Sequence, residues 1–211
     1  VFQSPQAIFW VTGSLAVVLS LTALRGARGT FAMVVFLYIA LAYYVVPFNL
    51  VRQGLAMAIL LWADRAYNRS RLAWLLLVLL AASFHVSALF FGALFLLARR
   101  LKPSPALVAA SLFAGVVIGA VSRVVPQFES FVTIFNDRYS DYISDGGAGL
   151  GTSLTIVFKS AAVIYLLILS RGKEVNRQHQ VLATLSLMFL VAGLSSKVMA
   201  RMDIYFGVFI V

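Results

Sequence analysis

The sequence has no cysteine, few charged residues and very few acidic ones. The lack of cysteine excludes disulfide frameworks, thiolate nucleophiles, Cys-based zinc sites and iron–sulfur clusters. Charged residues make up 11% of the 211 positions, whereas an average soluble domain has about a quarter. Hydrophobic residues make up 62%, and the mean hydropathy is +0.97. This composition excludes a soluble enzyme, a disordered segment and a disulfide-stapled secreted module.

Negative charge is especially scarce. The chain has 7 Asp and Glu residues against 17 Lys and Arg residues, which gives a net charge of +10. Such an excess can indicate nucleic-acid binding, but in a membrane protein it usually marks the cytoplasmic loops. Because the chain is so apolar, we expect membrane lipids as partners and no nucleic acid.

Long apolar runs fill most of the chain, and a helix of about 20 such residues crosses a bilayer. The candidate spans are residues 7–24, 31–46, 50–63, 72–98, 105–122, 154–170 and 181–194, and residues 204–211 begin another. They predict an all-α fold, a polytopic bundle of membrane helices that forms a single transmembrane domain over residues 1–211. Because the chain lacks an initial methionine and its last run is too short to cross a membrane, we expect a fragment of a longer multi-span protein.

Residues 72–98 decide the topology of this bundle. As one helix they would be about 40 Å long, against about 30 Å for the hydrocarbon core. As a helical hairpin that turns near His85, they return the following basic segment to the side from which the run began. The hairpin then brings 11 of the 17 basic residues to one side, namely Arg25, Arg28, Arg65, Arg69, Arg71, Arg99, Arg100, Lys102, Arg171, Lys173 and Arg177.

A single helix over residues 72–98 would remove most of this charge asymmetry. Since cytoplasmic loops carry the excess of Lys and Arg, we predict the hairpin and assign the 11 basic residues to the cytoplasm. One long loop, residues 123–152, then lies on the external side. Loops of this length are usually functional or disordered.

The start of the third apolar run contains the polar residues Asn49, Arg52 and Gln53. Placing polar or charged side chains in a membrane span costs free energy, so such residues are candidates for function. Their spacings of three and four predict one helical face. The guanidinium of Arg52 presents a planar fork of donors that suits a diphosphate. The alternative is an arginine that extends to the membrane interface or pairs with Asp203.

His85 lies at the turn of the predicted hairpin, in the segment Ser83-Phe-His-Val-Ser87. A neutral imidazole can accept a proton from a hydroxyl group, so His85 is a candidate general base. The alternative is a structural histidine that is hydrogen-bonded to a neighbouring helix.

Lys197, Arg201, Asp203 and Tyr205 form another group on the predicted external side. Lys197 and Arg201 are four residues apart and therefore share a helical face. They offer a second cationic surface for substrate, or they anchor the end of a membrane span.

Arg138 and Tyr142 lie in the long external loop, where an arginine beside aromatic residues suits phosphate clamping and sugar stacking. Interfacial anchoring is the alternative. Lys159 lies within an apolar run, where it either extends to the interface or pairs. Gly115 and Gly119 form a GxxxG pattern that predicts close helix packing.

Three segments in combination resemble the EpsG-type membrane proteins, which are Wzy-like polymerases of bacterial exopolysaccharide. The segments are Asn49-Leu-Val-Arg-Gln-Gly-Leu-Ala, then Phe84-His-Val-Ser-Ala-Leu, then Arg201-Met-Asp-Ile-Tyr-Phe. Each segment alone is a weak signal, but the three in this order are fairly specific. The resemblance covers about residues 38–206.

The resemblance implies a glycosyltransferase that joins undecaprenyl-diphosphate-linked oligosaccharide units at the outer face of the bacterial inner membrane. A hydroxyl group of the acceptor unit would attack the anomeric carbon of the donor unit and displace undecaprenyl diphosphate. Arg52, Arg201 and Arg138 are then candidates for stabilising the diphosphate, and His85 is preferred over Asp203 as general base. The chemistry needs no metal or cofactor, and analogy with other enzymes that use lipid-linked donors suggests a GT-C-like architecture.

Other functions stay open at this point. An O-antigen-ligase-like transferase would use the same donor with a different acceptor, which no motif encodes. A transporter or flippase for lipid-linked sugars would place ionisable residues near the midplane, often with repeat symmetry, and no internal repeat is evident. A non-catalytic scaffold of an export complex would tolerate replacement of the Arg and His residues. Polysaccharide export and chain-length proteins are candidate partners.

Overall fold

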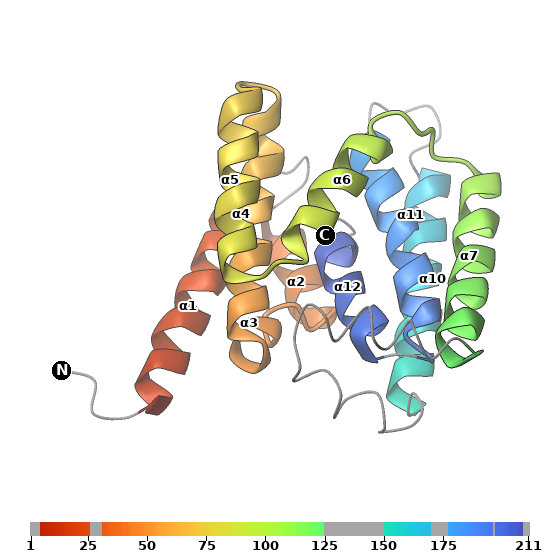
Figure 1. The fold of residues 1–211 in the computed structure, drawn as a ribbon, viewed down its shortest axis with the longest axis horizontal. Coiled ribbons are helices and arrows are strands. Elements are labelled where there is room, and N and C mark those ends of the chain that lie inside the picture. Colours follow the sequence, from red (N-terminus) through yellow and green to blue (C-terminus); the bar gives the residue numbers. More distant parts are fainter. Residues whose placement is uncertain (1–4, 26–30, 125–149, 170–176, 196, 209–211) are drawn as a thin grey trace. The chain divides into compact units, whose positions relative to one another are not determined.

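The computed structural model describes residues 5–25, 31–124, 150–169, 177–195 and 197–208, and all regular elements in these ranges are helices (Figure 1). The all-helical prediction is therefore confirmed for the described residues. The helices are α1 Pro5–Leu24, α2 Phe31–Ala40, α3 Val46–Asn49, α4 Val51–Tyr67, α5 Arg71–Phe84, α6 Ala88–Ala98, α7 Pro105–Val124, α10 Leu150–Leu169, α11 Arg177–Ala192 and α12 Lys197–Gly207.

The chain folds into two compact units, residues 1–95 and 96–210. The first contains α1 to α5 and most of α6, and the second contains α7, α10, α11 and α12. A single transmembrane domain over residues 1–211 stays a prediction.

Helix α4 is the centre of the first unit, where α1, α3 and α5 pack against it. Helix α1 runs parallel to α4, because the C-terminal part of each lies beside that of the other. The indole of Trp62 donates to the carbonyl oxygen of Leu19 at 3.1 Å, and Arg65 donates to that of Thr22 at 3.1 Å. The N-terminal part of α1 consequently lies at the same end of the unit as the start of α4.

Helix α5 runs antiparallel to α4 after a connection of only three residues. Its start is set by Ser70, whose hydroxyl oxygen accepts a hydrogen bond from the amide of Ala73 at 3.2 Å. Such an N-cap satisfies an amide that has no partner within the helix. The α4–α5 pair therefore has a connecting end and an open end (Figure 1).

The predicted turn within residues 72–98 is present. Helix α5 ends at Phe84, His85 is extended with φ −152° and ψ 113°, and α6 begins at Ala88. Helix α6 then returns along α5, since the ring of Phe95 stacks on Trp74 with a centroid distance of 5.7 Å. Gly92 lies beside Val78 on the way back. The run therefore forms two helices that turn near His85, as the charge distribution predicted.

The second apolar run differs from the prediction of one helix over residues 31–46. Helix α2 ends at Ala40, and the short α3 begins only at Val46. The physical reason is Ala42, whose φ of 59° is left-handed and incompatible with a continuing α-helix. The ring of Pro47 then occupies the first turn of α3, where a missing amide hydrogen costs nothing.

Helix α11 is the centre of the second unit, where α7, α10 and α12 pack against it. Two glycines of α7 lie close to α11 and to the segment that follows it. A Cβ atom on Gly115 would lie 2.6 Å from the carbonyl oxygen of Met188, and one on Gly119 would lie 3.0 Å from Oγ of Ser195. The prediction that this GxxxG pattern serves helix packing is confirmed.

One helix in the described part of the chain, Gln6–Leu24, is long and apolar enough to cross a membrane. Shorter apolar helices are Phe31–Ala40, Arg71–Phe84, Ala88–Ala98, Pro105–Val121 and Ile156–Tyr165. The polytopic bundle stays a prediction.

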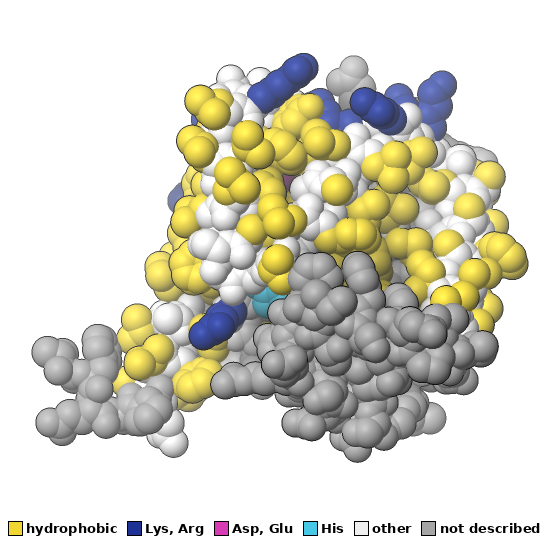
Figure 2. All heavy atoms as spheres, viewed as in Figure 1, with side chains coloured by type: hydrophobic (Ala, Val, Ile, Leu, Met, Phe, Trp, Pro, Cys, Tyr) yellow, Lys and Arg dark blue, Asp and Glu magenta, His cyan; other side chains and the backbone are white. Residues whose placement is uncertain are grey.

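The outer helices are more apolar than the central helices that they cover. Apolar side chains cover the outer faces of α5 and α7 (Figure 2), and Phe113 of α7 is 71% exposed. The central helices instead bury polar side chains, with Gln53 in α4 and with Gln178, Gln180, Thr184 and Ser186 in α11. Water-soluble domains show the opposite distribution. Outer faces of this kind suit lipid contact.

Candidate functional site

The open end of the α4–α5 pair brings Arg52 and His85 to the same level. Arg52 is the second residue of α4, and His85 follows the last residue of α5. Because the two helices are antiparallel and packed together, both residues lie at the end opposite the connection. The connecting end instead carries Arg65, Arg69 and Arg71, which are all exposed. The first unit thus separates its candidate site from its basic end, as the topology predicted.

Asn49 ends α3 whereas Arg52 and Gln53 lie in α4, so the three residues do not belong to one continuous helix as the prediction assumed. Leu50, with φ −129° and ψ 63°, separates α3, which ends at Asn49, from α4. Within α4, Arg52 is exposed whereas Gln53 is buried. Of these residues, Arg52 is therefore the one that offers a charged group to a ligand.

His85 is oriented by a neighbouring hydroxyl group. Its Nδ1 lies 2.8 Å from Oγ of Ser87, and the amide of His85 donates to the carbonyl oxygen of Ala81 at 3.0 Å. If Nδ1 carries the proton and donates to Ser87, Nε2 has the lone pair that a general base needs. The sequence contained Ser87 in the same motif, but only the structure connects its side chain to the imidazole.

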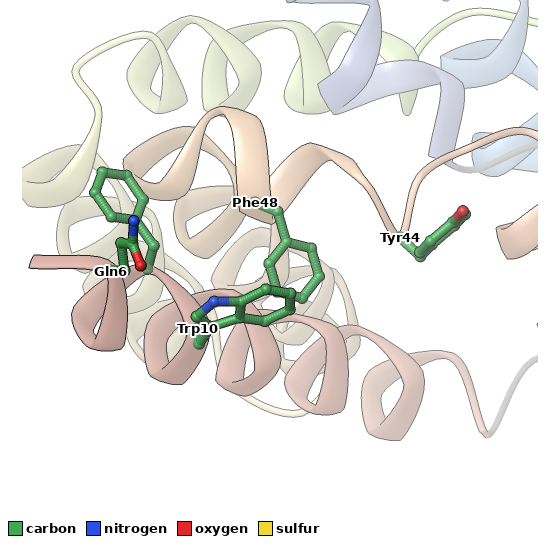
Figure 3. A pocket seen from close by; sticks show the side chains of 5 residues that line it. Gln6, Trp10, Tyr44 and Phe48 are labelled. Atoms are coloured by element: carbon green, nitrogen blue, oxygen red, sulfur yellow. The ribbon is translucent and has the colours of Figure 1, made fainter. Parts of the chain in front are cut away.

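An aromatic pocket lies at the same end of the first unit, with a volume of about 410 Å³. Three of its lining residues come from α1, namely Gln6, Phe9 and Trp10 (Figure 3). The other two are Tyr44, which lies between α2 and α3, and Phe48 of α3. The rings of Trp10 and Phe48 are 5.4 Å apart. The lining has no ionisable acid or base near neutral pH, so the pocket suits the apolar face of a sugar or lipid rather than a phosphate.

Asp203 is buried in the second unit and forms an ion pair with Lys159. Lys159 comes from α10 and Asp203 from α12, and they are only 5% and 3% exposed. Lys159 therefore pairs with Asp203 rather than extends to the interface. A carboxylate that is buried against an ammonium group is poorly placed to accept a substrate proton, which favours His85 as the base.

The face of α12 opposite Asp203 carries Arg201 and Tyr205. Two residues advance about 200° around an α-helix, and four residues return to nearly the same direction. Arg201 and Tyr205 therefore share one face, of which Arg201 is half-buried and Tyr205 is buried. Lys197 begins this helix, four residues before Arg201.

Arg138 and Tyr142 lie outside the described residues, as does most of the predicted external loop at 123–152. Among the residues that the structure describes, no group of three or more His, Asp or Glu side chains could hold a metal ion. The metal-independent reaction stays a prediction.

Comparison with known proteins identifies the family. Neither the curated proteins nor the solved structures contain a match to this chain. The sequence model of the EpsG family, however, matches residues 1–211, which is the whole chain. The chain belongs to the EpsG family, a family of Wzy-like exopolysaccharide polymerases that are embedded in membranes.

Proposed function

We propose that this chain joins undecaprenyl-diphosphate-linked oligosaccharide units into a polysaccharide at the outer face of the bacterial inner membrane. The observation that carries the proposal is the position of Arg52 and His85 at one end of the α4–α5 pair, in a chain of the EpsG family. A cation and a candidate base at one level are what displacement of a diphosphate by a hydroxyl group requires.

In the proposed reaction, the oxygen of an acceptor hydroxyl attacks the anomeric carbon of the donor sugar. The bond between that carbon and the diphosphate oxygen breaks, and its electron pair leaves with undecaprenyl diphosphate. His85 accepts the hydroxyl proton, and Arg52 stabilises the negative charge that develops on the leaving oxygen. Arg201, Lys197 and Arg138 are further candidates for binding the diphosphate, with Asn49, Gln53, Tyr142 and Tyr205 for the remainder of the substrate.

The exposed apolar faces of α5 and α7 support a position within the bilayer. The basic connecting end of the α4–α5 pair supports an orientation with this end in the cytoplasm and the Arg52–His85 end outside. A multi-pass bundle with GT-C-like architecture is part of the proposal, because the substrate is itself anchored in the membrane.

Incubation of the purified protein with undecaprenyl-diphosphate oligosaccharide tests the proposal, with chain extension as the readout. We expect His85→Ala and Arg52→Ala each to lower the rate of extension by about 100-fold or more, the range for a lost base or charge stabiliser. His179→Ala and Arg69→Ala are matched controls, because His179 lies in the first turn of α11 and Arg69 lies at the connecting end of the α4–α5 pair.

Normal extension by Arg52→Ala and His85→Ala would overturn these assignments. Transfer of one oligosaccharide to a different acceptor without chain growth would instead identify a ligase. Movement of the lipid-linked sugar across vesicle membranes without any new glycosidic bond would identify a flippase.

A further inference from the structure

A buried ion pair joins Lys159 of α10 to Asp203 of α12, two residues that are 44 positions apart in the sequence. Inside an apolar unit such a pair is costly to desolvate, so apolar side chains of similar size would often be at least as stabilising. Asp203 uses Oδ2 for Lys159, whereas the hydroxyl of Ser186 on α11 donates to the carbonyl oxygen of Ala183 at 2.7 Å. A charge pair that stability alone does not require indicates a functional constraint on the position of α12.

A second contact holds the same face of α12. Phe206, three residues after Asp203, stacks on Phe189 of α11 with a centroid distance of 5.1 Å and an angle of 12° between the rings. Residues three apart lie on one helical face. The ion pair to α10 and the ring stack to α11 therefore fix the rotation of this 11-residue helix about its own axis.

Fixing that rotation determines the direction of Arg201, which lies about 200° away from Asp203 around the helix. We propose that Lys159 and Asp203 are positioning residues, whose ion pair sets the rotation of α12 so that Arg201 is directed toward the diphosphate of the lipid-linked substrate. The inference rests on the proposed function, because it takes Arg201 as a ligand of that diphosphate.

The mechanism depends on the presence of both members of the charge pair. Without Lys159, the carboxylate of Asp203 loses its partner in an apolar environment, and a rotation or shift of α12 that hydrates it becomes favourable. Arg201 moves with the helix. Because the exchange keeps an ion pair between the same two backbone positions, the double variant Lys159→Asp with Asp203→Lys should restore the direction of Arg201.

Binding of undecaprenyl diphosphate to the purified full chain in detergent micelles tests the inference. We expect Asp203→Asn to weaken binding about tenfold in the native background but less than about twofold when Arg201→Ala is also present, since residues that act as a unit are not additive. The exchanged pair should bind within about threefold of the native protein. Thermal unfolding of each variant measures stability separately.

Several results would overturn the inference. Unchanged binding by Asp203→Asn would contradict it. Equal weakening of binding by Asp203→Asn in the native background and in the Arg201→Ala background would also contradict it, because a purely structural role predicts equal effects. If Asp203→Asn does not fold, the exchanged pair decides, because a folded exchanged pair that fails to bind also contradicts the inference. Unchanged binding by Arg201→Ala would instead remove Arg201 from the proposed function, which distinguishes that failure from the failure of the positioning pair.

Discussion

Ser87 orients the imidazole of His85 through a contact of 2.8 Å between Oγ and Nδ1. The contact joins residues only two positions apart, in the turn between α5 and α6. It determines which nitrogen faces a substrate, since the nitrogen that bonds to Ser87 is not available for proton transfer. At the residue scale, we therefore expect the candidate base to depend on the hydroxyl group of Ser87.

Substitution of Ser87 tests this dependence. Ser87→Ala removes one hydrogen bond worth about 1 kcal/mol, so we expect the rate of chain extension to fall about fivefold, with protein abundance in the membrane unchanged. Ser87→Thr keeps the hydroxyl group and should retain most of the rate. Ser83→Ala is a matched control, because the Ser83 hydroxyl donates within α5 to the carbonyl oxygen of Leu80 at 2.7 Å. Equal rates for Ser87→Ala and the native protein would show that Ser87 does not orient the base.

At the scale of elements, helix contacts in the second unit depend on small residues of α7. Gly115 brings the backbone of α7 against Met188 of α11, where the 2.6 Å separation from a Cβ atom is too short for any other residue. The neighbour in this contact is a carbonyl oxygen of the backbone, which cannot move without shifting α11. Since α11 carries Phe189, the partner of Phe206, a shift of α11 also affects α12.

We expect Gly115→Leu to destabilise the protein by about 1–3 kcal/mol, the usual cost of overpacking, and to lower its thermal unfolding temperature. Ala120→Leu is the control, because Ala120 is exposed on the same helix. Thermal unfolding of the purified variants measures the difference. A Gly115→Leu protein as stable as the Ala120→Leu protein would contradict the importance of this close approach.

The turn between α5 and α6 predicts the sidedness of two positions. Val86 lies in the turn and is 47% exposed, and Arg100 follows α6. The native chain has no cysteine, so a single introduced cysteine is the only thiol. We expect Val86→Cys to react with a membrane-impermeant thiol reagent in intact cells, and Arg100→Cys to react only after the membrane is permeabilised. Reaction of both from the same side would contradict the orientation of the hairpin.

At the scale of the whole molecule, the distribution of polarity distinguishes lipid from water as the surroundings. Phe113, Val157 and Phe158 are 71%, 63% and 67% exposed, while the glutamines of α4 and α11 are buried. In water such a surface would promote aggregation. In lipid it is favourable, and the polar groups are stabilised inside the units.

Substitution of Phe113 by lysine tests the nature of these surroundings. A lysine that faces the centre of a bilayer costs about 2.5–3.5 kcal/mol, so Phe113→Lys should lower the fraction of chains that insert into the membrane. Phe113→Leu keeps the face apolar and should insert normally. An insertion reporter fused to the chain measures both fractions. Equal insertion would place Phe113 outside the hydrocarbon region.

The helical class and the turn near His85 could be predicted because local sequence determines them. Apolar runs indicate helices, and the charge distribution required a return within residues 72–98. The end of α2 could not be predicted, because nothing in the apolar sequence indicates the left-handed conformation of Ala42. The same limitation applies to Leu50, whose non-helical conformation separates α3, which ends at Asn49, from α4.

The sequence by itself determined the composition-driven properties of this protein: an all-helical fold, apolar helices and a segregation of basic residues. These properties follow from the preferences of single residues and of neighbours a few positions apart. Only the tertiary structure decided that Lys159 pairs with Asp203, that Gln53 is buried while Arg52 is exposed, and that Ser87 contacts His85. Such pairings depend on which helix faces meet and on how each turn directs its side chains, and a sequence pattern does not specify either.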